Sequence, residues 1–140
     1  MAKNEYHNHL REVPLFSGLD DHELDAVGLA VTELRFDAGK VLMKEGESAH
    51  EMVVVLEGTL EVTRGGAHIA DIGPGSFAGE MALLTRAHRN STVTAKTDIV
   101  VLHIDGRSFS AVLEDAPQIA VKMLPVVAAR VTANSDHHSH

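Results

Sequence analysis

The residues best suited to bind a ligand lie in one short segment, between positions 75 and 93. Gly79 carries no Cβ, so a ligand can approach its backbone closely. Arg89 can donate two charge-assisted hydrogen bonds to one phosphate, whereas an ionised Glu80 only accepts hydrogen bonds and suits a sugar hydroxyl. A helix that begins at Gly79 would add unpaired backbone N–H groups that attract an anion. The segment therefore predicts a site for a small ligand with both a phosphate and a sugar hydroxyl.

The spacing of residues in this segment is also that of a known family. Phe77 and the run Gly79–Leu84 are followed, after a short loop, by Arg89–Val93. This pattern resembles the phosphate-binding cassette of cyclic nucleotide-binding domains. The resemblance implies that Arg89 binds the phosphate, that Glu80 binds the ribose 2′-hydroxyl, and that the ligand is cyclic AMP by default, with cyclic GMP as the alternative. The ligand-binding residues it implies are Phe77, Gly79, Glu80, Met81, Ala82, Arg89, Asn90 and Ser91.

Two positions differ from the commonest pattern of this family. Asn90 and Ser91 stand where the family most often has Ala, Ser or Thr, followed by Ala. The Asn90 side chain has a donor and an acceptor, so it could contact the phosphate, reach the amino group of a guanine, or crowd the pocket. In relatives a Thr or Ser at this place helps to select cyclic GMP, so Asn90 leaves the base preference open. One alternative is a protein-interaction domain with a degenerate pocket. Another is that the segment is only a strand, a short helix and a second strand, in which Glu80 and Arg89 are incidental surface residues.

Length and composition fit a single domain. The chain has 140 residues and no cysteine, which excludes disulfides and thiolate zinc sites and is compatible with a reducing cytoplasm. Its formal net charge of −8 argues against a nucleic-acid-binding surface, and it means that an anion must be captured by a local positive site. No apolar run approaches the ~20 residues of a membrane span, and the N-terminus lacks the apolar stretch of a secretory signal. We therefore expect one cytoplasmic domain over residues 1–140, with no direct nucleic-acid or membrane partner.

The middle of the chain, about residues 32–104, is expected to be β-structure. Short segments of strand-forming residues recur there at even spacing, separated by glycine-containing turns. The expected strands are 33–36, 40–43, 52–56, 59–64, 67–72, 91–96 and 99–104. Such spacing is typical of an antiparallel β jelly-roll barrel. The resemblance likewise implies the double-stranded β-helix of cyclic nucleotide-binding domains, so we predict a mainly β fold with helices at both ends.

Two short helices are expected before the barrel. Residues 4–13 have the spacing of an amphipathic helix that Pro14 closes, and Asp20 or Asp21 can cap a second helix. The phrase from Pro14 to Leu19, followed by that helix, also resembles the start of cyclic nucleotide-binding domains. The resemblance thus covers most of the chain.

Two further helices are expected after the barrel, over about residues 105–134. Asp105 caps the first, and the second starts at Ala116–Pro117 and should be kinked or split by Pro125. Its apolar side comprises Ile119, Val121, Met123, Leu124, Val127, Ala128 and Val131. In relatives a later helix covers the base of the ligand. The last polar candidates for that contact in this chain are Thr132, Asn134 and Ser135.

The family resemblance implies a sensor rather than a complete signalling protein. In the family mechanism, ligand phosphate draws the cassette helix inward and the C-terminal helices follow. Relatives carry an attached effector, such as a helix-turn-helix, a channel or a kinase-inhibitory segment, and no such segment is recognisable in these residues. We therefore expect a separate, unidentified protein effector, a fragment of a longer protein, or a homodimer formed through the apolar side of residues 119–131.

No pattern of catalytic residues is recognisable, so we expect no enzyme, no metal site and no cofactor. Of the ten histidines, those near the two termini should bind metal only adventitiously: His7, His9, His137, His138 and His140. His88, beside Arg89, is expected to be solvent-exposed. A cupin-like metalloenzyme would share the jelly-roll, but the remaining candidates do not fall into its ligand pattern: His50, His68, His88 and His103.

Overall fold

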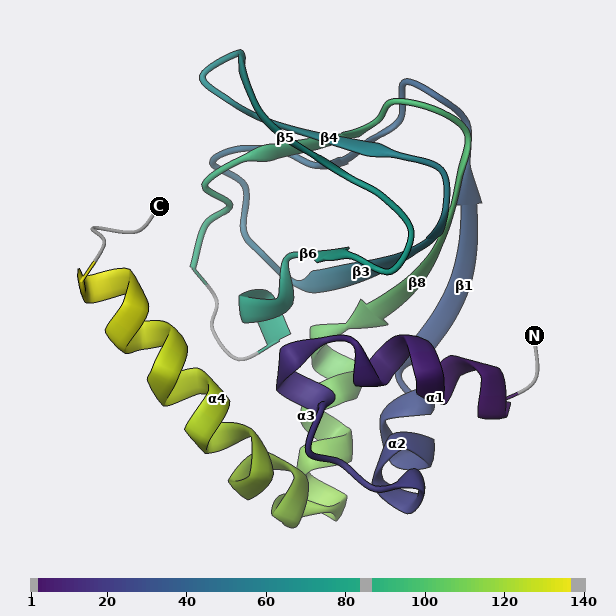
Figure 1. Ribbon diagram of the computed structural model, residues 1–140, viewed down its shortest axis with the longest axis vertical. Coiled ribbons are helices and arrows are strands. Elements are labelled where there is room, and N and C mark those ends of the chain that lie inside the picture. Colours follow the sequence, from purple (N-terminus) through teal and green to yellow (C-terminus); the bar gives the residue numbers. More distant parts are fainter. Residues whose placement is uncertain (1–2, 84–86, 137–140) are drawn as a thin grey trace.

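Two four-stranded antiparallel sheets face each other at one end of the molecule, with the N- and C-terminal helices at the other end (Figure 1). The computed structural model describes residues 3–83 and 87–136 of the chain. One sheet has the strand order β1-β8-β3-β6, and the other has the order β2-β7-β4-β5. The strands are β1 (Val31–Phe36), β2 (Val41–Met43), β3 (Glu51–Glu57), β4 (Leu60–Arg64), β5 (Ala67–Ile72), β6 (Phe77–Ala78), β7 (Thr92–Ala95) and β8 (Ile99–Asp105). The predicted mainly β jelly-roll fold with flanking helices is confirmed.

Helices α2 and α3 begin where their capping residues predict. They are α1 (Lys3–Arg11), η1 (Pro14–Phe16), α2 (Asp21–Gly28), η2 (Glu80–Leu83), α3 (Gly106–Asp115) and α4 (Pro117–Asp136), of which η1 and η2 are 3₁₀ turns. Asp20 caps α2 in a capping box with Glu23, in which each side chain accepts a hydrogen bond from the other residue's backbone N–H. Asp105 caps α3 by accepting a hydrogen bond from the Ser108 N–H.

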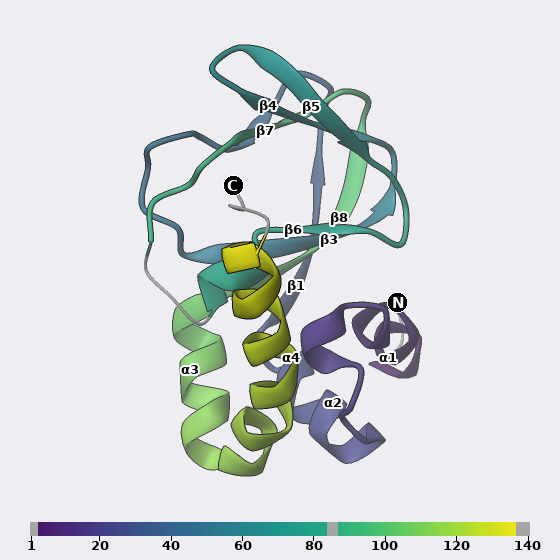
Figure 2. The same ribbon diagram turned by 60° about the vertical axis from the view of Figure 1, so that its left-hand side comes forward.

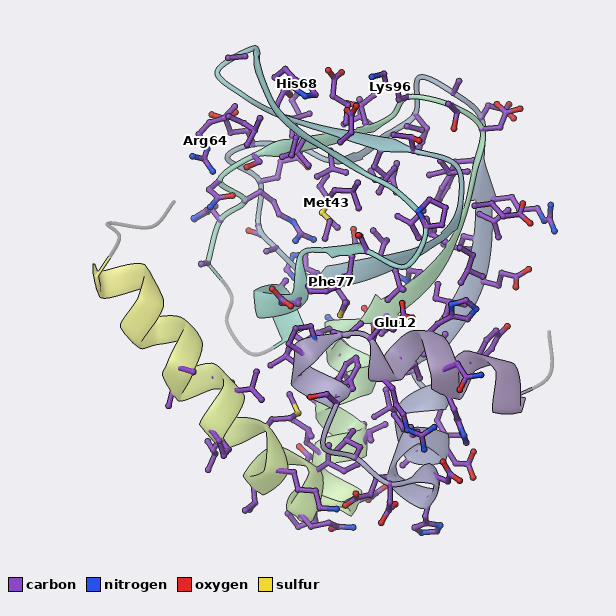
Figure 3. The ribbon with its side chains drawn as sticks, in the orientation of Figure 1. Glu12, Met43, Arg64, His68, Phe77 and Lys96 are labelled. Carbon is purple, nitrogen blue, oxygen red and sulfur yellow. The ribbon has the colours of Figure 1, made fainter. Side chains whose placement is uncertain are left out.

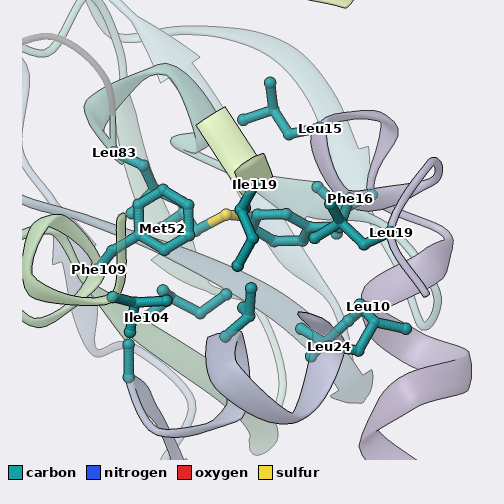
Figure 4. Close-up of a cluster of buried hydrophobic side chains, with 14 of the residues drawn as sticks. Leu10, Leu15, Phe16, Leu19, Leu24, Met52, Leu83, Ile104, Phe109 and Ile119 are labelled. Carbon is teal, nitrogen blue, oxygen red and sulfur yellow. The ribbon is translucent and has the colours of Figure 1, made fainter. Parts of the chain in front are cut away.

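Hydrophobic residues form two cores, and the central strands contribute to both. Along β3 and β8 successive side chains point to opposite faces of the sheet. Met52 packs into a core between the sheet and the helices, while its neighbour Val53 packs into a core between the two sheets. In the helical core the rings of Phe16 and Phe109 lie 5.8 Å apart, beside Ile119 of α4 (Figure 4). The two cores therefore share the strands that lie between them.

Some boundaries differ from the sequence prediction for local reasons. The two-residue strand β6 was not expected. β1 begins at Val31 instead of Glu33. Helix α2 ends early enough for this, because the N–H groups of Leu29 and Ala30 donate to carbonyls of its last turn. Pro125 does not split α4: the helix runs through it. Pro125 and Val121, four residues earlier, are both exposed, so the carbonyl that Pro125 leaves without an intrahelical partner lies on the solvent side.

The apolar side predicted for α4 is only partly buried. Ile119 and Met123 are 0% and 1% exposed in the helical core, but Val121 and Leu124 are 65% and 61% exposed. Val121 and Leu124 lie on the predicted apolar side, but this helix packs on the rest of the domain along a narrower face. No helix among the described residues is both long and apolar enough to cross a membrane.

Candidate ligand-binding site

Backbone pairing fixes the position of Arg89. The segment before β7 runs antiparallel to the β2–β3 loop, with a bridge between Ser48 and His88. Within it the Arg89 N–H donates to the Glu47 carbonyl at 2.7 Å, and the Gly46 N–H donates to the Arg89 carbonyl at 2.9 Å. This pairing directs the Arg89 side chain inward, where it is only 9% exposed, while His88 is exposed as expected.

The buried Arg89 guanidinium is held mainly by one residue, Glu51 at the start of β3. Nη2 of Arg89 donates to the Glu51 carbonyl oxygen at 2.7 Å, and the carboxylate oxygen Oε1 of Glu51 lies 3.9 Å from the same nitrogen. Burial lowers the pKa of Arg89, and the charge of Glu51 opposes this effect. A buried arginine needs a counter-charge when no ligand is bound, and Glu51 supplies it.

Gly79 allows this arginine to approach the backbone. Its φ of +82° is rarely adopted by other residues, and a Cβ there would lie 2.6 Å from Nη1 of Arg89 and 2.8 Å from the Glu51 carbonyl. The terminal methyl of Met43, which points between the two sheets in Figure 3, would lie 2.9 Å away. The sequence assigned Gly79 to contact with a ligand. The structure shows that the space beside its Cα holds the arginine.

Glu80 opens the short turn η2 and is buried, with 4% of its surface exposed. The Ala82 N–H donates to the Gly79 carbonyl at 3.0 Å, so the turn is a tight 3₁₀ turn of four residues. A turn this short carries little of the dipole of a long helix. The positive charge that an anion would meet therefore comes mainly from Arg89.

The other residues implied by the resemblance have different surroundings. Phe77 of β6 is half-buried and packs against the helical core. The backbone of Met81 lies in η2, but its side chain is outside the described part of the structure. Leu84 and the side chains of Thr132, Asn134, Ser135 and the C-terminal histidines are also outside the described residues.

Arg64 is a residue of this region that the sequence analysis missed. It ends β4, and its Nε donates to the Asn90 carbonyl at 2.9 Å while Nη2 lies 3.4 Å from the Ser91 hydroxyl (Figure 3). The Ser91 hydroxyl in turn donates to the Asn90 side-chain oxygen at 2.9 Å. The two unusual cassette positions thus form a network with a second arginine. In the sequence, the only sign of a role for Arg64 is that a basic residue stands just before the Gly65–Gly66 turn.

In the part of the chain that the structure describes, the barrel histidines are not grouped into an inward-facing metal site like that of a cupin. Among the described residues, the one group placed to hold a metal is at the surface of the β4–β5 hairpin, where single ligand atoms of Glu61, His68 and Asp71 lie within 4.8 Å of one another. Asp71 there also accepts a hydrogen bond from Lys96 at 3.0 Å (Figure 3). The arrangement does not favour the metalloenzyme alternative.

Comparison with known proteins supports the same family. The family model of the cyclic nucleotide-binding domain matches residues 33–116. A cAMP-dependent protein kinase regulatory subunit from Schizosaccharomyces pombe is 29% identical over 112 residues, which are 79% of this chain and 27% of that protein. The N-terminal domain of a transcriptional regulator from Streptomyces coelicolor has a similar structure, with a TM-score of 0.82 and 28% identity over 91% of this chain and 95% of that one.

A further solved structure is the regulatory domain of Toxoplasma gondii protein kinase A in complex with cAMP. It is 31% identical, with a TM-score of 0.72, over 81% of this chain and 45% of that one. The chain spans less than a third of the length of the curated relatives that it matches. The family model, by contrast, covers more than half of this chain and includes both Glu80 and Arg89. The chain therefore belongs to the family of cyclic nucleotide-binding domains.

Proposed function

We propose that this domain binds a cyclic nucleotide, cyclic AMP by default, and acts as a sensor or regulatory module without catalysis of its own. The observation that carries the proposal is the inward-facing guanidinium of Arg89, which is 9% exposed and lies against Gly79 within the cassette. A nearly buried arginine is costly to maintain unless it is paired, and an anionic ligand would pair with it. The Toxoplasma relative, solved with cAMP, supports this choice of ligand.

The proposed roles follow from the chemistry of each group. Arg89 donates to the cyclic phosphate, and the carboxylate of Glu80 accepts from the ribose 2′-hydroxyl. Backbone groups of Gly79, just before η2, and of Met81 and Ala82 within it supply further contacts to the ligand. Asn90 and Ser91 lie at the edge of the site, with Arg64 holding their backbone and hydroxyl.

The cassette is connected to the C-terminal helices through a buried side chain. Leu83 at the end of η2 is 5% exposed and belongs to the helical core that contains Phe109 of α3 and Ile119 of α4 (Figure 4). A ligand that draws η2 inward would therefore move a residue beside α3, and α3 in turn packs on α4. It can shift the conformation only by its differential affinity for the two states. An unidentified protein effector, or a second copy of the chain, would then recognise the new position of α4.

Calorimetric titration with cyclic AMP and cyclic GMP tests the proposal directly. We expect saturable binding that weakens at least about 30-fold in Arg89→Ala, because truncating one partner of a buried charge pair costs about 2–5 kcal/mol. Arg35→Ala, which removes an exposed arginine from β1, is the matched control and should bind as the wild type does. A 2′-deoxy analogue should bind more weakly if Glu80 contacts the ribose. Unchanged affinity in Arg89→Ala would refute the proposed role of the cassette.

A further inference from the structure

Glu51 is shared between the arginine of the site and a histidine outside it. Its carboxylate oxygen Oε1 lies 3.9 Å from Nη2 of Arg89, and its other oxygen, Oε2, lies 3.3 Å from Nε2 of His103. The strand register explains the second contact. Val53 is opposite His103 and Glu51 is opposite Asp105, so Glu51 and His103 are diagonal neighbours on one face of the sheet.

On the described strands paired with its own, His103 has few other charged neighbours. On its other side β1 places the uncharged Thr32 opposite it. On its own strand lies Asp105, whose pKa is lowered chiefly by the hydrogen bond from the Ser108 N–H, with smaller contributions from His103 and Arg107. Glu51 is therefore the carboxylate that connects His103 to Arg89, and the side chains of Glu51 and His103 are only 32% and 26% exposed.

We propose that Glu51 competes with the ligand phosphate for Arg89, and that protonation of His103 weakens this competition. The proposal rests on the proposed binding of a cyclic nucleotide. A carboxylate 3.9 Å from the guanidinium places negative charge beside the phosphate position. The orientation of Arg89 does not require that carboxylate, since the backbone carbonyl of Glu51 holds Nη2 at 2.7 Å. Glu51 thus lowers affinity more than it helps to position the arginine.

The pH dependence follows from the sign of each charge. Histidine side chains change charge between about pH 5 and 8. A protonated His103 offsets the Glu51 carboxylate, so less negative charge opposes the phosphate. A neutral imidazole leaves the charge of Glu51 unopposed, so Glu51 then acts on Arg89 with its full charge. Because a cyclic phosphodiester keeps one negative charge throughout, affinity should fall as pH rises from 5.5 to 8.

The test is calorimetric titration of the whole chain with cyclic AMP at several pH values from 5.5 to 8. Wild-type affinity should fall about two- to fivefold over this range, the size expected of one partly exposed charge pair. Glu51→Gln should bind at pH 8 as tightly as the wild type at pH 5.5, with little pH dependence. His103→Gln should also lose the pH dependence but keep the weaker alkaline affinity. Glu57→Gln, at the exposed end of the same strand, and His88→Gln, beside Arg89, control for general charge effects.

Several results would overturn the inference. Weaker binding in Glu51→Gln at pH 8 would mean that the carboxylate positions Arg89. If affinity still depended on pH in both Glu51→Gln and His103→Gln, the pH dependence would come from other groups. The nucleotide-free protein gives an independent measurement, since the imidazole NMR signals of His103 should shift in Glu51→Gln, which removes the carboxylate 3.3 Å from Nε2. If that shift occurs but no cyclic nucleotide binds the wild type at any pH, the proposed function fails, although the Glu51–His103 pair is real.

Discussion

At the scale of single residues, the site depends on how closely the Arg89 guanidinium approaches the backbone of Gly79. Gly79→Ala should both strain the backbone and displace the arginine, because the new Cβ would lie 2.6 Å from Nη1. Gly66 is a matched control: it has the same φ of +82°, but a Cβ added there would meet nothing within 4 Å. We expect Gly66→Ala to cost about 1–3 kcal/mol of stability and no affinity, and Gly79→Ala also to weaken nucleotide binding at least about tenfold.

Chemical denaturation and calorimetry of the two variants separate these effects. Equal losses of stability with unequal affinity would show that crowding at Gly79 acts on the ligand site. If both variants bound nucleotide like the wild type, the close approach of Arg89 to Gly79 would have no role in binding. The same comparison separates a conformational requirement for glycine from a steric one.

At the scale of elements, an ion pair connects α4 to the start of α2. Nζ of Lys122 donates to Oε1 of Glu23 at 2.5 Å, and Glu23 is the buried acid of the α2 capping box. The ribbons of α4 and α2 can be followed in Figure 2. The hydrogen bond from Lys122 is the main cause that lowers the pKa of Glu23 below its ordinary value of 4.5, and the same contact raises the pKa of Lys122. The last helix is thereby fixed to the N-terminal helices.

Lys122→Gln should make the stability of the fold depend less on pH, because it removes the partner of Glu23. Because the pKa of Glu23 is lower in the folded chain, its ionised form stabilises the fold fully above pH 4.5, and this stabilisation is lost as pH falls through the folded value. We expect Lys122→Gln to have a lower melting temperature than the wild type at pH 7. The difference between the two melting temperatures should become smaller below pH 4.5. Lys44→Gln, in the loop after β2, removes an exposed lysine as a control. A difference that stays constant down to pH 3 would contradict the assignment.

At the scale of the whole molecule, the barrel and the helices should unfold together. β3 and β8 supply alternate side chains to both cores, so neither core survives the loss of these strands. Phe109→Ala, in the helical core, should cost about 3–5 kcal/mol. Val101→Ala, in the core between the sheets, should cost less because a smaller side chain is removed.

Urea titrations followed by circular dichroism at 222 nm and by NMR signals of barrel amides measure this cooperativity. In each variant the two signals should change at one common midpoint, shifted to lower urea. Barrel amides that remain native after the helical signal is lost in Phe109→Ala would show two independent units instead. Such a result would also weaken the idea that motion of η2 is passed to α3 and α4.

Much of the fold could be predicted because its signals are local. Asp20 and Asp105 each precede a helix and cap it, and alternating or continuous apolar segments marked seven of the eight strands. The strand β6 was missed because two residues are too few to show a period. The exposure of Val121 and Leu124 could not be predicted, because helical periodicity finds an apolar side but not how much of it the domain covers.

The sequence by itself determined the family, the mainly β fold and the presence of Glu80 and Arg89 in one short segment, because each depends on residues a few positions apart. Only the tertiary structure decided what surrounds Arg89. Its contact with Glu51 joins residues 38 positions apart, and the contact of Arg64 with Asn90 joins residues 26 positions apart. Such contacts follow from the register between strands and loops, and a shift of one residue would turn every side chain to the opposite face. That is why the counter-ion of the site could not be read from the sequence.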